Sequence, residues 1–206
     1  IVPVNMIEDF ENTSDPSEWP CNPSVTSSMP KYTKATAEER FRLLFMGLHD
    51  VCEDQGWGDP WSYNRLREIH TAIELKHKIA QHYSGSDAED DIGEAEYKST
   101  IGKTINATYN GISVKGSWRA QDKYLREEKL LKYKNHYFVR YDGAEIAEIW
   151  RMSGEDVYNY LKPRLKVKYD KLKTAEKLPA DPRLGDSICM SAIKKYGEKL
   201  KWSLPP

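Results

Sequence analysis

The pattern of apolar and polar positions begins with a strong helix signal. Residues 36–39, with the sequence Thr-Ala-Glu-Glu, are typical of a capping box in which Thr36 caps the helix and Glu39 reaches back to it. Apolar residues follow at helical spacing over 41–52. We therefore expect a helix that ends before Gly56 and buries this apolar stripe in the core.

Beyond this helix the pattern changes from helical spacing to alternation. Residues 62–82 carry one apolar stripe and predict a second helix, which leads into a hairpin around the turn at 90–93. The rest of the chain predicts, in order, a strand at 104–109, a turn at Asn110-Gly111 with a short continuation at 112–114, a helix at 118–131, strands at 136–141 and 144–150, a short helix that starts at Ser153 and is limited by Pro163, and a last helix at 187–200.

The acidic hairpin over residues 84–99 carries the candidate chemistry. With the turn at 90–93, Asp87 and Glu96 lie opposite each other, and alternation puts Lys98 on the same face. A hard divalent cation could sit between two such carboxylates, with the lysine beside its bound water. Asp90 and Asp91 compete with Asp87 for the role of second carboxylate, but they fall inside the turn.

Composition narrows the class of protein. The 206 residues are 31% charged and 39% hydrophobic with a formal charge of −1, which is typical of a soluble globular chain. We expect an irregular arm at 1–36, a core at 37–161 and a basic C-terminal extension at 162–206 packed on or near it. No apolar run approaches the roughly 20 residues that span a bilayer, so we expect no membrane segment.

Cysteine usage points to a reducing compartment. The three cysteines are odd in number and far apart, so they match neither a zinc site nor a disulfide framework: Cys21, Cys52 and Cys189. We therefore expect a cytoplasmic protein.

The segment Asp87…Glu96-Tyr97-Lys98, inside the order helix–strand–strand–strand–helix–strand, resembles the PD-(D/E)xK nuclease superfamily, and most of all its type II restriction endonucleases. The resemblance covers residues 62–150 by element order, and the specific motif is three residues long. A second match, Glu127-x-Lys129, falls in a predicted helix, where residues two apart diverge.

The resemblance implies an α/β (α+β) restriction-endonuclease-like fold, a mixed central β-sheet flanked by helices in the order αβββαβ. It also implies Mg²⁺-dependent cleavage of DNA. Asp87 and Glu96 would be the metal ligands, and Lys98 the water-orienting base or electrostatic helper. Ser86 stands where the motif's name has proline.

Further residues follow from the same resemblance. Many members use a glutamate from the preceding helix, and Glu74 is assigned this catalytic role here, with Glu68 as the alternative. Gln121 and Tyr124 lie near the place where some repair nucleases of the superfamily carry a Gln and a Tyr, but the spacing differs.

Polar side chains directly after the motif strand could read base edges or bind phosphates. The alternative is an ordinary edge strand and turn. The residues concerned are Lys103, Asn106, Thr108, Tyr109, Asn110, Ser113, Lys115 and Arg119. The basic stretch 162–177, with Tyr158, Tyr160 and Tyr169 nearby, is either a solvated helix surface or a phosphate-binding patch.

Three hypotheses remain open. The first is a Mg²⁺-dependent type II restriction endonuclease that cuts double-stranded DNA at a specific short sequence as a homodimer, since each subunit can then cut one strand of a two-fold symmetric site. The second is a structure-specific repair or junction nuclease, or a phage or homing nuclease, of the same fold. The third is a non-catalytic module that binds nucleic acid or a protein partner through the basic tail and the tyrosine-rich helix, and it predicts no metal affinity at the hairpin.

Overall fold

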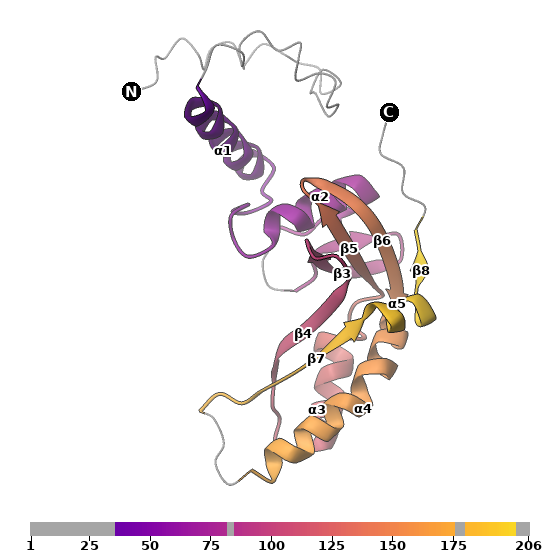
Figure 1. Ribbon diagram of the computed structural model, residues 1–206. Coiled ribbons are helices and arrows are strands. Elements are labelled where there is room, and N and C mark those ends of the chain that lie inside the picture. The colour runs from indigo at the N-terminus through magenta and orange to yellow at the C-terminus, as the bar shows by residue number, and fades with distance from the viewer. Residues whose placement is uncertain (1–35, 82–84, 176–179, 201–206) are drawn as a thin grey trace. The chain divides into compact units, whose positions relative to one another are not determined.

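The computed structural model describes residues 36–81, 85–175 and 180–200. The irregular arm predicted for residues 1–36 therefore lies outside the described residues, apart from Thr36. Residues 48–203 form one compact unit, and the chain up to Gly47 belongs to a second. The larger unit is a mixed α/β structure, with a mostly antiparallel sheet and helices (Figure 1), so the predicted α/β class is confirmed at this level.

Six strands form the main sheet in the order β1-β2-β3-β5-β6-β8. Their bounds are β1 Lys78–Ile79, β2 Ala88–Asp90, β3 Gly93–Thr100, β5 Asn135–Asp142, β6 Glu145–Ser153 and β8 Glu198–Lys199. Neighbours are antiparallel except β3 and β5, which are parallel. A parallel pair requires a long crossover, and the chain between β3 and β5 supplies it.

That crossover begins with β4 (Asn106–Ser113), which pairs antiparallel with β7 (Arg183–Cys189) in a separate two-stranded sheet. The predicted turn at Asn110-Gly111 is wrong. The strand continues through it with a register shift, and Gly111 takes a φ of 68° that favours glycine. An Asn-Gly pair is compatible with a bulge as well as with a hairpin turn. Here β4 pairs with β7 on both sides of this pair, so the chain forms a bulge.

Helix α1 (Ala37–Asp54) has the predicted start and end. The Glu39 amide donates to Thr36 Oγ1 at 3.2 Å, and the Thr36 amide donates to the Glu39 carboxylate at 2.8 Å. The predicted burial of its apolar stripe is wrong, because Phe41 is 68% exposed and of this helix only Cys52 is buried. Periodicity detects an amphipathic helix but carries no information about what covers it.

Helix α2 (Arg65–Leu75) is shorter than the predicted 62–82. Lys76 adopts a left-handed conformation, with φ at 58°, and its amide bonds back to the last turn. The residues that follow form β1, in which Lys78 pairs with Glu89 of β2. Residues 78 and 79 pair with the hairpin as a strand and so do not extend the helix. This pairing is a tertiary contact, and the helical spacing of the sequence does not reveal it.

The later helices differ from their predictions in length. The segment predicted as one helix at 118–131 is α3 (Trp118–Tyr124) followed by a wider π-type turn at Leu125–Lys129. The last helix, α5 (Met190–Tyr196), is shorter than the predicted 187–200 because strands β7 and β8 take its flanks.

Helix α4 (Gly154–Lys173) starts as predicted, with Ser153 Oγ accepting from the Asp156 amide at 3.0 Å. It then runs through Pro163, so the prediction that this proline limits it is wrong. Leu161 and Leu165 on either side of the proline are fully buried. Their packing outweighs the missing hydrogen bond and the steric cost of proline in a helix.

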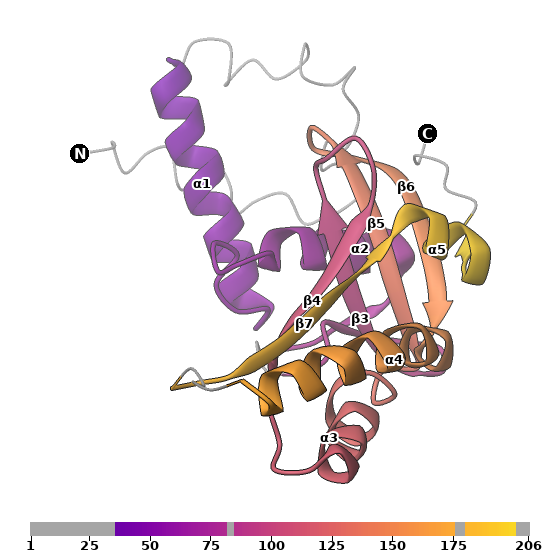
Figure 2. The same cartoon turned by 60° about the horizontal axis from the view of Figure 1, so that its bottom comes forward.

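Two apolar clusters cover opposite faces of the main sheet. Ala72 of α2 packs with Tyr97 and Tyr137 on one face. On the other face, Phe138 packs with residues of β4, β7, α3 and α4, such as Leu165. Figure 2 shows α4 running alongside β7, and residues beyond 162 thus supply a substantial part of this core.

Candidate active site

The acidic hairpin forms with the predicted register. Glu89 pairs with Glu94 and Asp90 with Gly93, and the Asp87 amide donates to the carbonyl of Ala95 at 3.0 Å. Asp87 is thus the residue just before β2. It lies across from β3 at the point where the segment Glu96–Lys98 begins. The base of the hairpin is further held by Tyr133, whose hydroxyl donates to the Gly85 carbonyl at 2.9 Å.

Three side chains meet on the face of β3 that turns toward β4. The Tyr97 amide donates to Asp87 Oδ2 at 2.7 Å, which fixes this carboxylate against the strand. The Lys98 ammonium group donates to Glu96 Oε1. The side chains of Lys98 and Glu96 are 26% and 15% exposed, so the cluster is largely buried but still accessible to solvent.

The electrostatics of the cluster are those of crowded acids around one cation. Burial, with the nearby charges of Glu96 and Glu68 adding to it, raises the pKa of Asp87 well above its usual range. Burial alone would lower the pKa of Lys98, but the carboxylates of Glu96 and Asp87 raise it overall. The lysine is therefore a stable ammonium ion, and burial disfavours the ionised form of Asp87.

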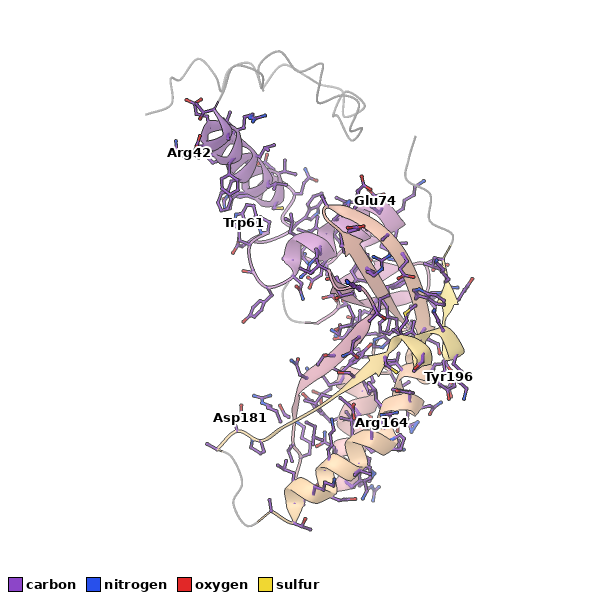
Figure 3. All side chains as sticks on the ribbon, in the orientation of Figure 1. Arg42, Trp61, Glu74, Arg164, Asp181 and Tyr196 are labelled. Atoms are coloured by element: carbon purple, nitrogen blue, oxygen red, sulfur yellow. The ribbon has the colours of Figure 1, made fainter. Side chains whose placement is uncertain are left out.

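The helix glutamate that interacts with this cluster is Glu68. Burial raises its pKa, Arg65 opposes that shift, and Glu96 and Lys98 both act on it electrostatically. Glu74, to which the sequence assigned the role, lies 3.5 Å from His70 Nε2 and influences Tyr141 instead. Figure 3 shows Glu74 on α2 beside the β5–β6 hairpin. The structure thus brings Glu68 to the cluster and leaves Glu74 outside it.

Arg65 explains why Glu68 is so placed. It is nearly fully buried, its Nε donates to the Trp57 carbonyl at 2.8 Å, and Nη2 donates to the carbonyl of Ala80 beside β1. Its Nη1 lies 3.5 Å from the Glu68 carboxylate. One guanidinium group therefore ties the first turn of α2 to the edge of the sheet and orients Glu68. Sequence reasoning missed this residue, because a lone arginine on a helix normally faces solvent.

The competing acids of the turn have other partners. Asp90 Oδ1 accepts from the amides of Ile92 and Gly93 at 3.0 Å, which closes the turn. Its other oxygen accepts from Tyr137 and Asn135 at 2.8 and 2.7 Å, and hydrogen bonding keeps the pKa of Asp90 low despite some burial. Asp90 is a turn-forming residue on the opposite face from Glu96, and Asp91 is exposed.

The donor set of the cluster suits a hard divalent cation. Within the described ranges, no three His, Cys, Asp or Glu side chains converge as a complete metal cage. Mg²⁺ is commonly bound by one or two carboxylates, with waters and substrate phosphates completing its octahedron. Asp87 and Glu96 supply such a pair, and the charges of Glu96 and Glu68 add to burial in raising the pKa of Asp87, so a cation here would meet several negative groups.

Strand β4 divides the predicted DNA-binding residues between two faces. Asn106, Thr108 and Asn110 are exposed, as are Lys103 and Arg119 on the flanking segments. Ser113 accepts from Arg183 at 2.6 Å, and Lys115 lies over the ring of Tyr124. Tyr109 points the other way, is buried and bonds to His136 at 2.9 Å, so its placement does not support the predicted contact with DNA.

Gln121 and Tyr124, which the family resemblance had singled out, lie in α3. Gln121 is fully buried, accepts from the Lys115 amide at 2.8 Å and donates to the Ser113 carbonyl at 3.2 Å. It secures the end of β4, which is a structural role.

The lysines of α4 are largely paired within the chain. Lys162 lies 3.0 Å from Asp122, Lys166 bonds to Asp170, and Lys168 lies 3.2 Å from Asp186. Tyr158 and Tyr169 are buried, while Arg164, which Figure 3 marks on α4, lies over the ring of Tyr160. This favours the solvated helix surface over the phosphate-binding patch, because each pair already neutralises the lysine locally.

No protein-family model matches this sequence, and no curated protein matches it significantly. Among the described residues, none of the helices combines the length and the apolarity needed to cross a bilayer. The functional argument therefore rests on the geometry of the acidic hairpin and its surroundings.

Proposed function

We propose that this protein is a Mg²⁺-dependent DNA endonuclease of the PD-(D/E)xK type, acting as a type II restriction endonuclease. The observation that carries the proposal is the cluster of Asp87, Glu96 and Lys98 on one face of a hairpin, with Glu68 contributed by the preceding helix. The parallel pair β3–β5 between antiparallel strands also supports a restriction-endonuclease-like mixed sheet.

Each residue of the cluster has a distinct role in this proposal. Asp87 and Glu96 would hold Mg²⁺, which supplies a nucleophilic water at neutral pH and relieves negative charge on the phosphate. Lys98 stays protonated beside Glu96, so it orients the water and stabilises the developing charge electrostatically. Glu68, which lies 3.5 Å from Arg65 Nη1, would accept hydrogen bonds from water bound to the metal.

Double-stranded DNA is the proposed partner, and the exposed face of β4 is the proposed surface for it. Asn106, Thr108 and Asn110 alternate along this face, and amide and hydroxyl groups can contact both base edges and phosphates. A homodimer is proposed with it, since two copies are needed to cut both strands of a symmetric site. Sedimentation of the chain with and without DNA measures this directly.

The deciding experiment is incubation of mixed-sequence plasmid with the protein and Mg²⁺. We expect discrete fragments whose sequenced ends share one short site, and Lys98→Ala should lower the cleavage rate by a factor of about 100 or more. Lys129→Ala is the matched control, because Lys129 belongs to the second Glu-x-Lys match but lies in the π-type turn outside the cluster. It should cut like the parent.

The outcomes separate the candidate functions. A ladder or smear in place of discrete bands would favour a repair or junction nuclease of the same fold. Cleavage by Lys98→Ala at the parental rate would exclude the proposed site, and the absence of both cleavage and Mg²⁺ binding by calorimetry would favour a non-catalytic module.

A further inference from the structure

A buried tyrosine lies against the key lysine of the cluster. The ring centroid of Tyr109 is 5.3 Å from Lys98 Nζ, and the tyrosine is only 6% exposed. The face of an aromatic ring attracts a cation within about 6 Å, more strongly where water is excluded. Lysine has a long flexible stem, so a hydrogen bond to Glu96 alone would leave its ammonium group loosely aimed. The ring supplies a second contact.

The ring of Tyr109 is itself anchored at its far end. Its hydroxyl lies 2.9 Å from His136 Nδ1, and the two rings pack with centroids 5.6 Å apart. His136 is fully buried, and its Nε2 lies 3.0 Å from the carbonyl oxygen of Leu130. His136 also pairs with Glu96 in the parallel register of β3 and β5. The anchor therefore belongs to the strand next to the one that carries the cluster.

The Leu130 carbonyl determines which group donates in each hydrogen bond of this chain, from Tyr109 through His136 to Leu130. A carbonyl oxygen only accepts, so His136 Nε2 carries the proton and Nδ1 accepts from the Tyr109 hydroxyl. Burial lowers the pKa of His136 to about 4, so the imidazole is neutral near pH 7. Burial also raises the pKa of Tyr109 well above its usual range, so the phenol keeps its proton.

We propose that Tyr109 and His136 form a positioning pair that aims the Lys98 ammonium group at the reacting phosphate. The inference deepens the proposed nuclease function and rests on it for the effect on cleavage rate. The restraint on Lys98 is a property of the fold, so it can be measured whether or not the protein cuts DNA. Both side chains are buried, so their proposed role is to position Lys98 and not to contact the substrate.

The first measurement is the mobility of the Lys98 ammonium group by NMR of side-chain ¹⁵Nζ, with the signal assigned by its loss in Lys98→Ala. We expect a restricted ammonium in the parent protein and a clearly mobile one in Tyr109→Leu, because leucine keeps apolar bulk without the ring face. Tyr169→Leu is the matched control, since Tyr169 is also buried in this core with a lysine over its ring. It should leave Lys98 restricted.

A second pair of variants covers the case in which Tyr109→Leu does not fold. Tyr109→Phe keeps the ring and removes only the bond to His136, and Tyr169→Phe removes a comparable buried bond, to the Lys115 carbonyl at 3.0 Å. Tyr109→Phe should increase Lys98 mobility partly, and Tyr169→Phe should not. Unchanged Lys98 mobility in a folded Tyr109 variant would overturn the inference.

The second measurement is steady-state cleavage. Tyr109→Leu should lower kcat about tenfold and Tyr109→Phe by less, with KM within about twofold of the parent, because only the aim of the lysine changes. A rise in KM with unchanged kcat would contradict the positioning role. If the parent protein does not cut DNA, the proposed function fails, and the NMR result alone decides whether the pair restrains Lys98.

Discussion

At the scale of single residues, the acidic cluster lowers the free energy of unfolding of the metal-free protein. Asp87 lies in a largely buried site with Glu96 and Glu68 nearby, and these surroundings disfavour its ionised form. Lys98 acts to lower the pKa of Asp87, and Arg65 acts to lower that of Glu68, but the pKa of Asp87 remains raised overall. Such a conflict is typical of sites whose geometry serves chemistry, and a bound cation would relieve it.

We therefore expect Asp87→Asn to stabilise the metal-free protein at neutral pH, on the order of 1 kcal/mol. Because the folded-state pKa is raised, the folded chain binds more protons than the unfolded chain above about pH 4, and parental stability falls as pH rises through this window. Asparagine can still accept from the Tyr97 amide.

Urea unfolding at several pH values measures the difference. The free energies of unfolding of the two proteins should converge in acid, and a parent as stable as the variant at pH 7 would contradict the prediction.

The choice between the two helix glutamates gives a second residue-scale prediction. Glu68→Gln should lower plasmid cleavage at least tenfold, because the charge that acts on Glu96 and Lys98 is lost. Glu74→Gln should cut at the parental rate, since Glu74 lies against His70 outside the cluster. Initial rates at saturating Mg²⁺ measure both. The reverse order would restore Glu74 to the role that the sequence assigned it.

At the scale of elements, the predictions that hold are mostly those that depend on bonds within a few residues. The capping box at Thr36, the cap at Ser153 and the hairpin turn at Asp90 all form as predicted, because each depends on bonds within a few residues. The ends of α2 and α4 do not, because pairing with β2 shortens one and core packing carries the other past Pro163. For the same reason the Asp87–Glu96 register was predictable and the choice of Glu68 was not.

The start of α4 gives an element-scale prediction. A Cβ on Gly154 would collide with the carbonyl oxygen of Tyr133 and would also press on that of Leu130. Because both atoms are backbone, little can shift, and Gly154→Ala should destabilise the protein by about 2–4 kcal/mol. Gly116→Ala is the control, since no atom lies within 4 Å of its Cβ position. Thermal unfolding compares them, and equal midpoints would contradict the predicted clash.

At the scale of the whole molecule, both faces of the main sheet are needed to build the cluster. Helix α2 on one side brings Glu68, and β4 on the other side brings Tyr109 beneath Lys98. The sequence indicated the hairpin between them but not these flanking contributions, because they join segments far apart in the chain. Tyr109 was predicted as a DNA contact from its polar neighbours, although alternation along β4 turns it inward.

The pairing of β4 with β7 also means that the parts of the cluster form at different stages of synthesis. A chain leaves the ribosome from its N-terminus, and the hairpin with Asp87 and Glu96 needs only local pairing to form. Strand β4, which carries Tyr109, waits for β7 near the other end of the described chain. During translation the acidic residues would therefore gather early, whereas the lysine would be aimed last. The proposed nuclease would therefore reach its full cutting rate only after β7 has been synthesised and has paired with β4.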